Sequence, residues 1–458
     1  MRLFRVFIPV GALTLLTVEI LLVTACYLLA AFLFFSPDPT VFLLYEGGFG
    51  RIALMVATVI LVMYLQDLYS QTRVRGTVLL AQNLCLVMGT AFLVQGSVSY
   101  LRPGMRMPIR VMVPAAILSA AAIFGWRLLF TAIVWKVGRQ RLLFVGDSRL
   151  LDETAAYLAR HPDLGMEILG YVDDRPFSQP PAHAKLIGPL AALSEIAAAT
   201  RPDRIVVGMQ ERRKAMPMST LLELRFAGYA VEEAPAFFEN ICGHVSLEYL
   251  RPSQLIFSGQ FTSHNHWILG AIDVGLALAG TLLLLPAMLL VAVLIKLSSS
   301  GPVLYRQTRV GQDGVPFTLY KFRSMYEDAE KHTGAVWSTA NDPRIMPLGR
   351  LLRKLRLDEI PQLFNVLRRE MSLVGPRPER PEFVQVLSEQ IPYYRQRHAV
   401  KPGITGWAQI NYKYGANFED AVRKLEYDLY YIKYMSQSLN NYILFATLKT
   451  MLLRRGAQ

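Results

Sequence analysis

The sequence predicts a membrane α-helical block, then an α/β Rossmann-like domain, and then a mixed α/β domain that begins with a further membrane helix. The first observation is the composition: 53% of the 458 residues are hydrophobic and only 18% are charged, whereas soluble proteins average about 25% charged residues. The second is a set of four long apolar runs near the N-terminus. The third is an alternation of strand-like and helix-like segments after them, which is typical of a parallel sheet.

Each of the four apolar runs is long enough to cross a hydrocarbon core of about 30 Å as a helix. They lie at Phe7–Phe35, Ile52–Tyr69, Thr77–Val98 and Val111–Trp135. Basic residues favour the cytoplasmic side of such helices, and they flank the block and its central loop at Arg2, Arg5, Arg73, Arg75, Lys136, Arg139 and Arg141. We therefore expect both ends of the block in the cytoplasm, whereas three arginines between the last two runs favour the opposite orientation: Arg102, Arg106 and Arg110. Glu19, inside the first run, fits either a functional site or a contact between helices.

Residues 139–250 are expected to form the Rossmann-like domain. "RQRLLFVGDS" predicts a strand, a glycine turn and then a helix, while "MEILGYVDD" and "PDRIVVGM" predict further strands. A dinucleotide fingerprint would need glycines two and five places after Gly146, where the chain has Ser148 and Leu151. Asp173 and Asp174 end the second strand, where a ribose-binding acid could sit. The pattern favours a structural or regulatory domain over a working NAD site.

A linker at residues 251–266 leads to the apolar run Trp267–Leu297, which is long enough for a fifth crossing. Pro286 lies near its middle, where proline removes one backbone hydrogen bond and kinks a helix. A crossing would carry the last domain to the face of the membrane opposite the Rossmann-like domain. A re-entrant helix, broken at Pro286, would keep both domains on one face. These residues leave both topologies open.

The chain from residue 299 onward is strongly basic. It holds 24 Lys and Arg against 15 Asp and Glu, which accounts for +9 of the net charge of +13. A basic domain beside a membrane indicates an anionic surface or substrate, and we expect no nucleic-acid partner. "GPVLYRQTRVGQDGVPFTLYKFRSM" predicts a hairpin with Lys321 and Arg323 on its second strand. "HAVKPGITGWAQINYKYG" predicts a loop, and "NNYILFATLKTMLLRR" a helix against the membrane or the core.

Asp358 and Glu359 stand side by side in this basic setting. Pro361 fits the first turn of a helix that runs to about Glu370, which would put both acids at the positive end of that helix. Helix capping is the simple explanation of such acids. The chemical one is that one carboxylate attacks phosphorus while its neighbour holds Mg²⁺.

Three cations are the predicted partners of an anionic substrate. Arg377 lies between two prolines after a glycine, which favours a rigid, bidentate phosphate clamp. Lys321 and Arg323 would neutralise a second phosphate. Trp407 is expected to be a packing residue.

Five stretches in this order resemble the bacterial polyprenyl-phosphate phosphoglycosyl transferases of the monotopic superfamily: "GPVLYRQTRVG", "YKFRSM", "LDEIPQLFNVL", "MSLVGPRPERPEF" and "KPGITGWAQIN". The similarity runs from about Asp273 to the C-terminus, and the layout before it resembles the large, exopolysaccharide-initiating members. The resemblance implies that sugar-1-phosphate moves from a UDP-sugar to undecaprenyl phosphate, with release of UMP. Among the sugars, it favours glucose and galactose. It implies a multi-pass protein of the bacterial inner membrane whose soluble domains face the cytoplasm.

The resemblance also implies roles for single residues. Asp358 would be the nucleophile of a phosphosugar-aspartyl intermediate, and Glu359 the Mg²⁺-binding acid. Lys321, Arg323 and Arg377 match positions around the substrate phosphates. The family has a re-entrant helix at the segment of Pro286, which favours no fifth crossing. The chain departs from the family at Leu269 and Gly270, where a Lys-Arg pair is usual, and at Leu285, where serine is usual before the proline.

The expected domains are thus residues 1–138, 139–250, 251–266, 267–298 and 299–458, the last being catalytic. Two alternatives are a membrane-tethered NAD-dependent nucleotide-sugar enzyme and a non-catalytic scaffold of polysaccharide assembly. Cys26, Cys85 and Cys242 have neither metal-ligand nor disulfide spacing. His264 and His266 are weak metal candidates, and a homodimer is left open.

Overall fold

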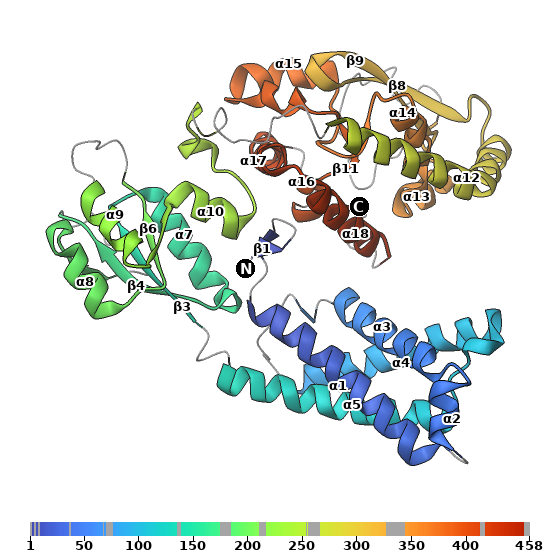
Figure 1. Cartoon of the computed structure of the whole chain (residues 1–458). Coiled ribbons are helices and arrows are strands. Elements are labelled where there is room, and N and C mark those ends of the chain that lie inside the picture. The colour runs from blue at the N-terminus through green and yellow to red at the C-terminus, as the bar shows by residue number, and fades with distance from the viewer. Residues whose placement is uncertain are drawn as a thin grey trace. The chain divides into compact units, whose positions relative to one another are not determined.

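The computed structural model describes residues 2–3, 6–7, 10–35, 38–66, 68–69, 77–134, 139–174, 185–209, 217–252, 254, 266–326, 344–412 and 417–452. Two compact units divide the chain (Figure 1): Phe7–Ala234 in the first, and Pro235–Gln458 with Arg2–Val6 in the second. Most of the expected linker, including His264 and the side chain of His266, lies outside the described residues. The domain boundaries given above stay predictions.

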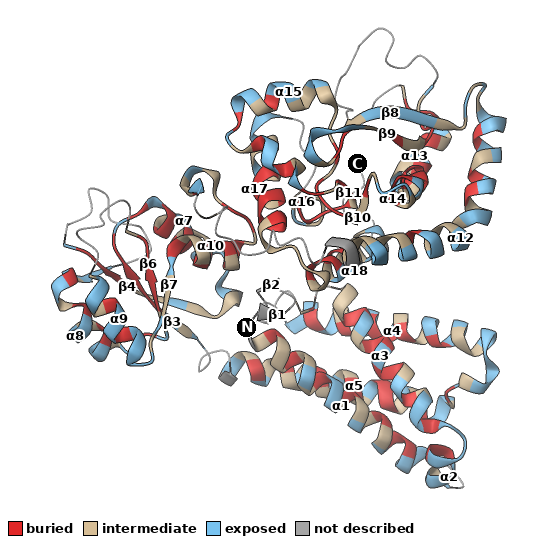
Figure 2. Ribbon diagram, turned by 45° about the horizontal axis from the view of Figure 1, so that its top comes forward, coloured by how far each residue is buried: buried red, intermediate tan, exposed pale blue. Residues whose placement is uncertain are grey.

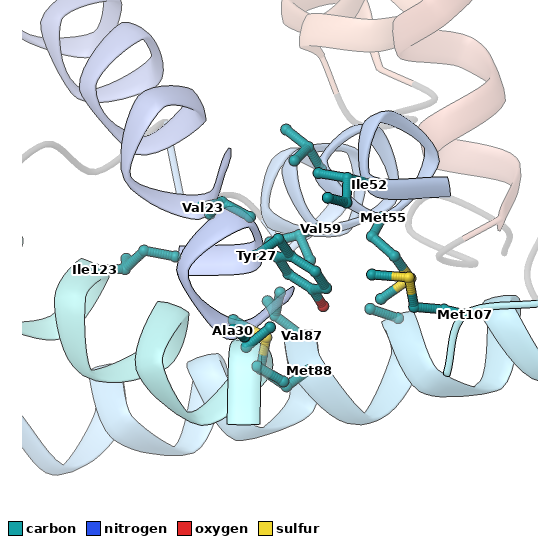
Figure 3. Close-up of a cluster of buried hydrophobic side chains, with 14 of the residues drawn as sticks. Val23, Tyr27, Ala30, Ile52, Met55, Val59, Val87, Met88, Met107 and Ile123 are labelled. Atoms are coloured by element: carbon teal, nitrogen blue, oxygen red, sulfur yellow. The ribbon is translucent and has the colours of Figure 1, made fainter. Parts of the chain in front are cut away.

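The first unit begins with a block of apolar helices. They are α1 (Val10–Phe34), α2 (Pro39–Leu44), α3 (Gly48–Leu65), α4 (Thr77–Leu101) and α5 (Ile109–Leu129), which a π-helical turn extends through Phe130–Val134. All except α2 are long and apolar enough to cross a membrane, so the four predicted apolar runs do form long helices. Tyr27 lies among Val23, Val59 and Val87 in the buried cluster between these helices (Figure 3).

A buried ion pair joins the first and last helices of this block. Arg127 Nε on α5 donates to Glu19 Oε1 on α1 at 2.7 Å, and its Nη2 donates to Oε2 at 3.2 Å. Arg127 Nη1 also donates to the carbonyl oxygen of Leu68 at 2.8 Å. Removing one partner of a buried pair would leave an uncompensated charge. Of the two explanations of Glu19, the contact between helices is therefore the one that the structure supports.

A five-stranded parallel sheet follows in the same unit, in the order β5-β4-β3-β6-β7. The strands are β3 (Gln140–Val145), β4 (Met166–Val172), β5 (Leu186–Gly188), β6 (Arg204–Val207) and β7 (Ala230–Glu233). The helices are α7 (Arg149–Arg160), α8 (Leu193–Thr200) and α9 (Met218–Phe226). The predicted parallel sheet is confirmed, and its order counted along the chain is 3-2-1-4-5. The edge strand β5 has only three residues, which carry too little pattern to predict a strand.

The second unit is a mixed α/β structure. Its helices are α10 (Ala234–Cys242), α12 (His266–Ser298), α13 (Pro347–Lys354), α14 (Leu363–Leu367), α15 (Pro381–Gln390), α16 (Trp407–Asn411), α17 (Phe418–Tyr434) and α18 (Gln437–Leu452), with the short 3-10 helices η5 (Leu247–Tyr249), η8 (Leu357–Gln362) and η9 (Tyr394–Ala399). The strands are β8 (Leu304–Val310), β9 (Pro316–Phe322), β10 (Ser372–Val374) and β11 (Gly403–Thr405). Strands β8 and β9 form the predicted antiparallel hairpin.

The segment expected as a loop around Trp407 is instead a strand and a helix. Strand β11 pairs in parallel with β10, and α16 follows directly. Tight backbone contact explains the difference, since a Cβ at Gly403 or Gly406 would clash with the backbone of Gly375. The glycines therefore bring the two motifs together, which patterns of hydrophobicity do not report.

The residues that follow β7 pack within the second unit. Glu239 on α10 accepts from Lys433 Nζ at 2.8 and 2.9 Å and from the hydroxyl of Tyr434 at 2.6 Å. Trp407 Nε1 donates to the carbonyl oxygen of Gly243 at 2.6 Å, and the ring is buried. Trp407 is thus a packing residue, as predicted.

Helix α12 bends, so that its C-terminal part turns away from its N-terminal part (Figure 2). We call the parts before and after Pro286 the N-terminal and C-terminal arms. Ala277 on the N-terminal arm packs with Leu319 and Val366, and Asp273 Oδ2 accepts from Ser372 Oγ at 2.6 Å. The C-terminal arm packs Met288, Val291 and Ile295 against Phe322 and Leu352. Both arms therefore rest on the same α/β structure.

Candidate active site

The two adjacent acids lie in the first turn of η8. Arg356 precedes them with φ of 53°, a left-handed conformation that separates η8 from α13. Pro361 lies inside η8, and the α-helix that follows runs only from Leu363 to Leu367. The predicted helix from Pro361 to about Glu370 is therefore wrong in both bounds. The acids stay near a helical N-terminus, but of a tighter and shorter helix.

Glu359 is surrounded by cations. Its Oε1 accepts from Arg377 Nη2 at 2.8 Å and from Lys321 Nζ at 3.3 Å, and its Oε2 lies 3.5 Å from Arg356 Nη1. Burial by itself raises the pKa of Glu359, but the combined attraction of Arg377, Lys321 and Arg356 outweighs it and holds the pKa well below its ordinary value. Glu359 is thus a fixed anion that gathers the basic side chains.

Asp358 is the opposite case. The carboxylate is buried, and among the described residues no side chain donates a hydrogen bond to it. Burial, and then the charge of Glu359, raise the pKa of Asp358 above its ordinary value, and Lys321, Arg353 and Arg377 offset part of this shift. Two neighbouring carboxylates whose environments push their pKa values apart are suited to different tasks.

Lys321 reaches the acids from the hairpin. Strand β9 is fixed beside η8 because the buried Asn365 accepts from the backbone N of Tyr320 at 3.1 Å and donates to the oxygen of Thr318 at 2.7 Å. Burial lowers the pKa of Lys321, and the attraction of Glu359 opposes this. Lys321 and Arg377 thus both lie beside the dyad; their predicted contact with phosphates stays a prediction.

Arg323 has a different contact from the predicted one. Its Nη1 donates to the carbonyl oxygen of Ser300 at 2.6 Å and its Nη2 to that of Ser299 at 2.9 Å, just after the C-terminal arm of α12. A cation that binds the last carbonyls of a helix satisfies groups that lack a partner within it. The structure thus gives Arg323 a role at the end of the membrane helix, and its phosphate role stays a prediction.

Comparison with known proteins identifies the part of the chain that carries this site. The family described as "Bacterial sugar transferase" matches residues 264–454. An exopolysaccharide production protein PSS of Rhizobium leguminosarum bv. phaseoli is 41% identical over 189 residues, which are 40% of this chain and 94% of that protein. The chain belongs to the bacterial sugar transferase family.

Two longer relatives extend the similarity. A UDP-N-acetylgalactosamine-undecaprenyl-phosphate N-acetylgalactosaminephosphotransferase of Aeromonas hydrophila is 43% identical over 221 residues, or 48% of this chain and 52% of that protein. A UDP-glucose:undecaprenyl-phosphate glucose-1-phosphate transferase of Escherichia coli (strain K12) is 36% identical over 291 residues, or 62% of each. The chain thus spans about half of the first and less than two thirds of the second.

The dyad fits a Mg²⁺ ion on one condition. Among the described residues, no group of three or more His, Cys, Asp and Glu side chains could hold a metal. Mg²⁺, however, is commonly bound by one or two carboxylates together with substrate phosphates and waters. Glu359 fits that pattern as the protein's carboxylate, with the substrate completing the site.

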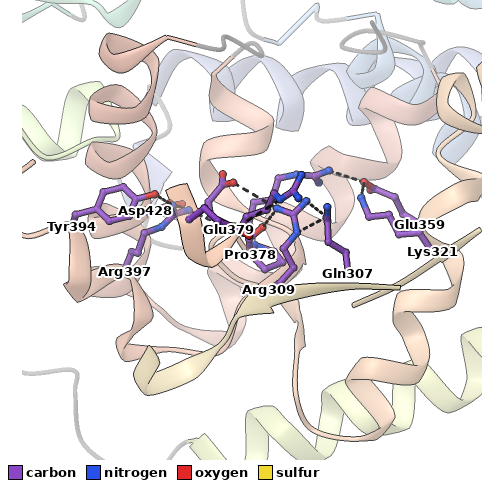
Figure 4. A network of polar contacts seen from close by, with 12 residues as sticks. Gln307, Arg309, Lys321, Glu359, Pro378, Glu379, Tyr394, Arg397 and Asp428 are labelled. Carbon is purple, nitrogen blue, oxygen red and sulfur yellow. Dashed lines mark hydrogen bonds and ion pairs between the residues drawn. The ribbon is translucent and has the colours of Figure 1, made fainter. Parts of the chain in front are cut away.

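Sequence reasoning missed two arginines beside the site. Arg309 Nη1 donates to the carbonyl oxygen of Pro378 at 2.9 Å, and Arg397 Nη2 donates to that of Arg377 at 3.0 Å. Figure 4 shows the network from Lys321 and Glu359 at one end to Arg397 and Asp428 at the other. These arginines act on backbone oxygens far along the chain, and no local pattern would have indicated them.

Proposed function

We propose that this protein transfers sugar-1-phosphate from a UDP-sugar to undecaprenyl phosphate and releases UMP, as the first membrane step of exopolysaccharide biosynthesis. The observation that carries the proposal is the difference between the two acids. Glu359 holds three cations, while the adjacent Asp358 accepts no side-chain hydrogen bond among the described residues. A carboxylate left available beside a cluster of cations is suited to attack a phosphate that those cations hold.

The reaction runs in two displacements. An Asp358 oxygen forms a bond to the sugar-bearing phosphorus, and the bond from this phosphorus to the UMP oxygen breaks, so that UMP leaves with the electron pair. An oxygen of undecaprenyl phosphate then attacks the same phosphorus and releases the Asp358 carboxylate. Arg377 and Lys321 reduce the repulsion between the carboxylate and the phosphate oxygens it approaches.

Glu359 would hold Mg²⁺ together with the diphosphate of the sugar nucleotide, which leaves Asp358 available for attack. The ion would neutralise charge on the leaving phosphate. Glu359, kept ionised by its three cations, also orients Lys321 and Arg377 whether or not the ion is bound.

The membrane helix α12 enters and leaves the same leaflet in this proposal. A straight helix of 33 residues would be about 50 Å long, so its two ends would lie far apart. Instead, both arms pack on one α/β structure, with Asp273 bonded to Ser372 and Arg323 bonded after the other arm. Leu282, Leu283, Leu289, Leu290 and Leu297 are exposed and would face lipid.

Cysteine labelling tests this topology. In a background without Cys26, Cys85 and Cys242, cysteines at the exposed positions Arg251 and Ser300 should react only from the cytoplasmic side. A cysteine at Glu46, in the turn between α2 and α3, should react only from the periplasmic side and serves as the control. Periplasmic labelling at Ser300 would overturn the re-entrant arrangement and leave a fifth crossing.

The parallel-sheet domain is proposed to be a Rossmann-like structural or regulatory domain without NAD. Its strand order 3-2-1-4-5 agrees with that fold. Ser148 accepts from the backbone N of Leu151 at 3.3 Å, so it caps α7 where a bound pyrophosphate would need free N–H groups. Asp147 adds negative charge at this end of the sheet. Its charge is the second cause, after burial, of the raised pKa of Asp152. Nicotinamide absorbance in purified protein would overturn this view.

The transfer itself is tested by UMP release from a panel of UDP-sugars, with and without undecaprenyl phosphate. Relatives named for glucose and N-acetylgalactosamine transfer make UDP-glucose and UDP-N-acetylgalactosamine the first substrates to test, with UDP-galactose beside them. Lipid-linked sugar with stoichiometric UMP supports the proposal. No UMP release from any of them in folded protein would favour a scaffold in polysaccharide assembly.

A further inference from the structure

The loop Pro376–Glu379, which carries Arg377, is held through its backbone by two arginines of other elements. Arg397, on η9, donates to the carbonyl oxygen of Arg377, and Arg309, on β8, donates to that of Pro378. The backbone N of Val310 also donates to the oxygen of Glu379 at 3.0 Å. Three successive residues of the loop are therefore fixed by groups outside it.

Arg397 is itself firmly held. Its Nη2 lies 2.9 Å from Asp428 Oδ2 on α17, and its Nη1 donates to the hydroxyl of Tyr394 at 2.6 Å. Arg397 is 6% exposed and Asp428 2% exposed, so neither contact is weakened by solvent. One planar guanidinium thus joins α17, η9 and the loop, a set of contacts that lysine could not reproduce.

We propose that Arg397 is a positioning residue that aims the Arg377 guanidinium at the phosphates of the sugar nucleotide, with Asp428 and Tyr394 holding Arg397 in place. This inference rests on the proposed function, in which Arg377 holds a phosphate. Arg397 does not touch substrate; it fixes the main chain of Arg377, whose guanidinium donates to Glu359. Because a shift of about 1 Å can cost a hundredfold in rate, a change in this main-chain contact is enough to impair Arg377.

A double-mutant cycle in the full-length, detergent-solubilised protein tests the idea. Binding of UDP-glucose and UDP-N-acetylgalactosamine, with Mg²⁺, is measured by calorimetry for wild type, Arg377→Ala, Arg397→Lys and the double variant. Loss of a charged phosphate contact should weaken binding about 30-fold in Arg377→Ala. Arg397→Lys should weaken it about fivefold, since the loop keeps its contact with Arg309. The double variant should match Arg377→Ala within about twofold, because Arg397 acts through Arg377.

Two further variants keep the test decisive. Tyr394→Phe removes one hydrogen bond to Arg397 and should repeat the coupling more weakly if Arg397→Lys does not fold. Arg423→Lys changes another arginine paired with a carboxylate of α17, Glu426, at 2.7 Å, and should leave binding within twofold of wild type.

The outcomes separate the two proposals. If the losses from Arg397→Lys and Arg377→Ala multiply, Arg397 has a general structural role and the inference is overturned. Binding that shows the predicted coupling without any UMP release would overturn the proposed transfer and keep the inference. Wild type that binds neither sugar nucleotide would overturn both.

Discussion

The carboxyl edge of the parallel sheet and the η8 site share a local pattern but differ in the charges around them. At the sheet edge, Gly146, Asp147 and Ser148 lead into α7. There, burial and then Asp147 raise the pKa of Asp152. At η8, the adjacent acids also begin a helix, but the cations of Glu359 more than offset its burial and lower its pKa.

The difference shows that a turn, an acid and a helix start do not make an anion site by themselves. The sheet edge gathers acids, which repel phosphate, and its helix start is already capped by Ser148. The η8 site receives Lys321 from β9 and Arg377 from the loop after β10. The sign of the neighbours brought from other elements decides which place is suited to a sugar nucleotide.

The largest expected effect is that of replacing Asp358, the proposed nucleophile. Asp358→Asn keeps the shape but removes the nucleophilic charge, so UMP release should fall about a thousandfold or more, as when other enzymes lose their nucleophile. Asp147→Asn, the matched change at the sheet edge, should leave the rate within about twofold, since it lies outside the reaction. A substantial loss in Asp147→Asn would break the contrast between the two regions.

Glu359→Gln should reduce both activity and stability. Without the buried anion, the partly buried Lys321 and Arg377 are less compensated, so unfolding should become easier by about 3 kcal/mol. Their altered positions and the weaker metal site should lower the rate about a hundredfold. Denaturant titration and UMP release measure these effects. Glu382→Gln removes a pair with Arg380 in which the glutamate is 64% exposed and should cost less than about 1 kcal/mol; a similar cost in both variants would contradict the role given to the cations around the buried Glu359.

The pH dependence of kcat/KM should report the raised pKa of Asp358. Attack needs the ionised carboxylate, so kcat/KM should fall about tenfold per pH unit below an inflection that lies above the ordinary aspartate value near 3.9. Glu359 has a lowered folded pKa, so its stabilising effect is complete above its unfolded value near 4.3 and is lost only as pH falls through the folded value. Activity should therefore fall while the protein is still folded, which circular dichroism checks at each pH. An inflection at or below pH 3.9 would contradict the assignment.

The smallest expected effect is at the sheet edge. Ser148→Ala removes the cap of α7 and should destabilise the protein by about 1 kcal/mol. Transfer activity at a temperature where the variant is folded should stay within about twofold, because the domain binds no reacting group in this account. Thermal unfolding measures the stability and UMP release the activity. A loss of activity well beyond twofold in the folded variant would indicate that the sheet domain regulates transfer.

Much of this site could be predicted because its chemistry lies in continuous motifs. Asp358 and Glu359 are adjacent, and the structure brings two of the three predicted cations, Lys321 and Arg377, to Glu359. Arg323 does not lie beside Lys321 as expected. Side chains two residues apart on a strand share a face, but β9 ends at Phe322, so this rule no longer applies to Arg323.

Other features depended on contacts that no short pattern encodes. Arg397 and Asp428 act on the site through a main-chain oxygen, so their residue types alone gave no indication. The parallel direction of the long strands could be predicted from their apolar runs. By contrast, β10 and β11 pair because Gly375 and Gly403 allow their backbones to approach closely.

Exchange of labelled UMP into the UDP-sugar substrate, without undecaprenyl phosphate, tests the central claim most directly. A covalent intermediate on Asp358 forms from enzyme, Mg²⁺ and UDP-sugar alone, and its reversal incorporates free UMP. Wild type should therefore catalyse lipid-independent exchange, and Asp358→Asn should catalyse neither exchange nor transfer. A preparation that transfers sugar-1-phosphate to added lipid but shows no exchange in its absence would contradict the intermediate and favour direct attack by the lipid phosphate.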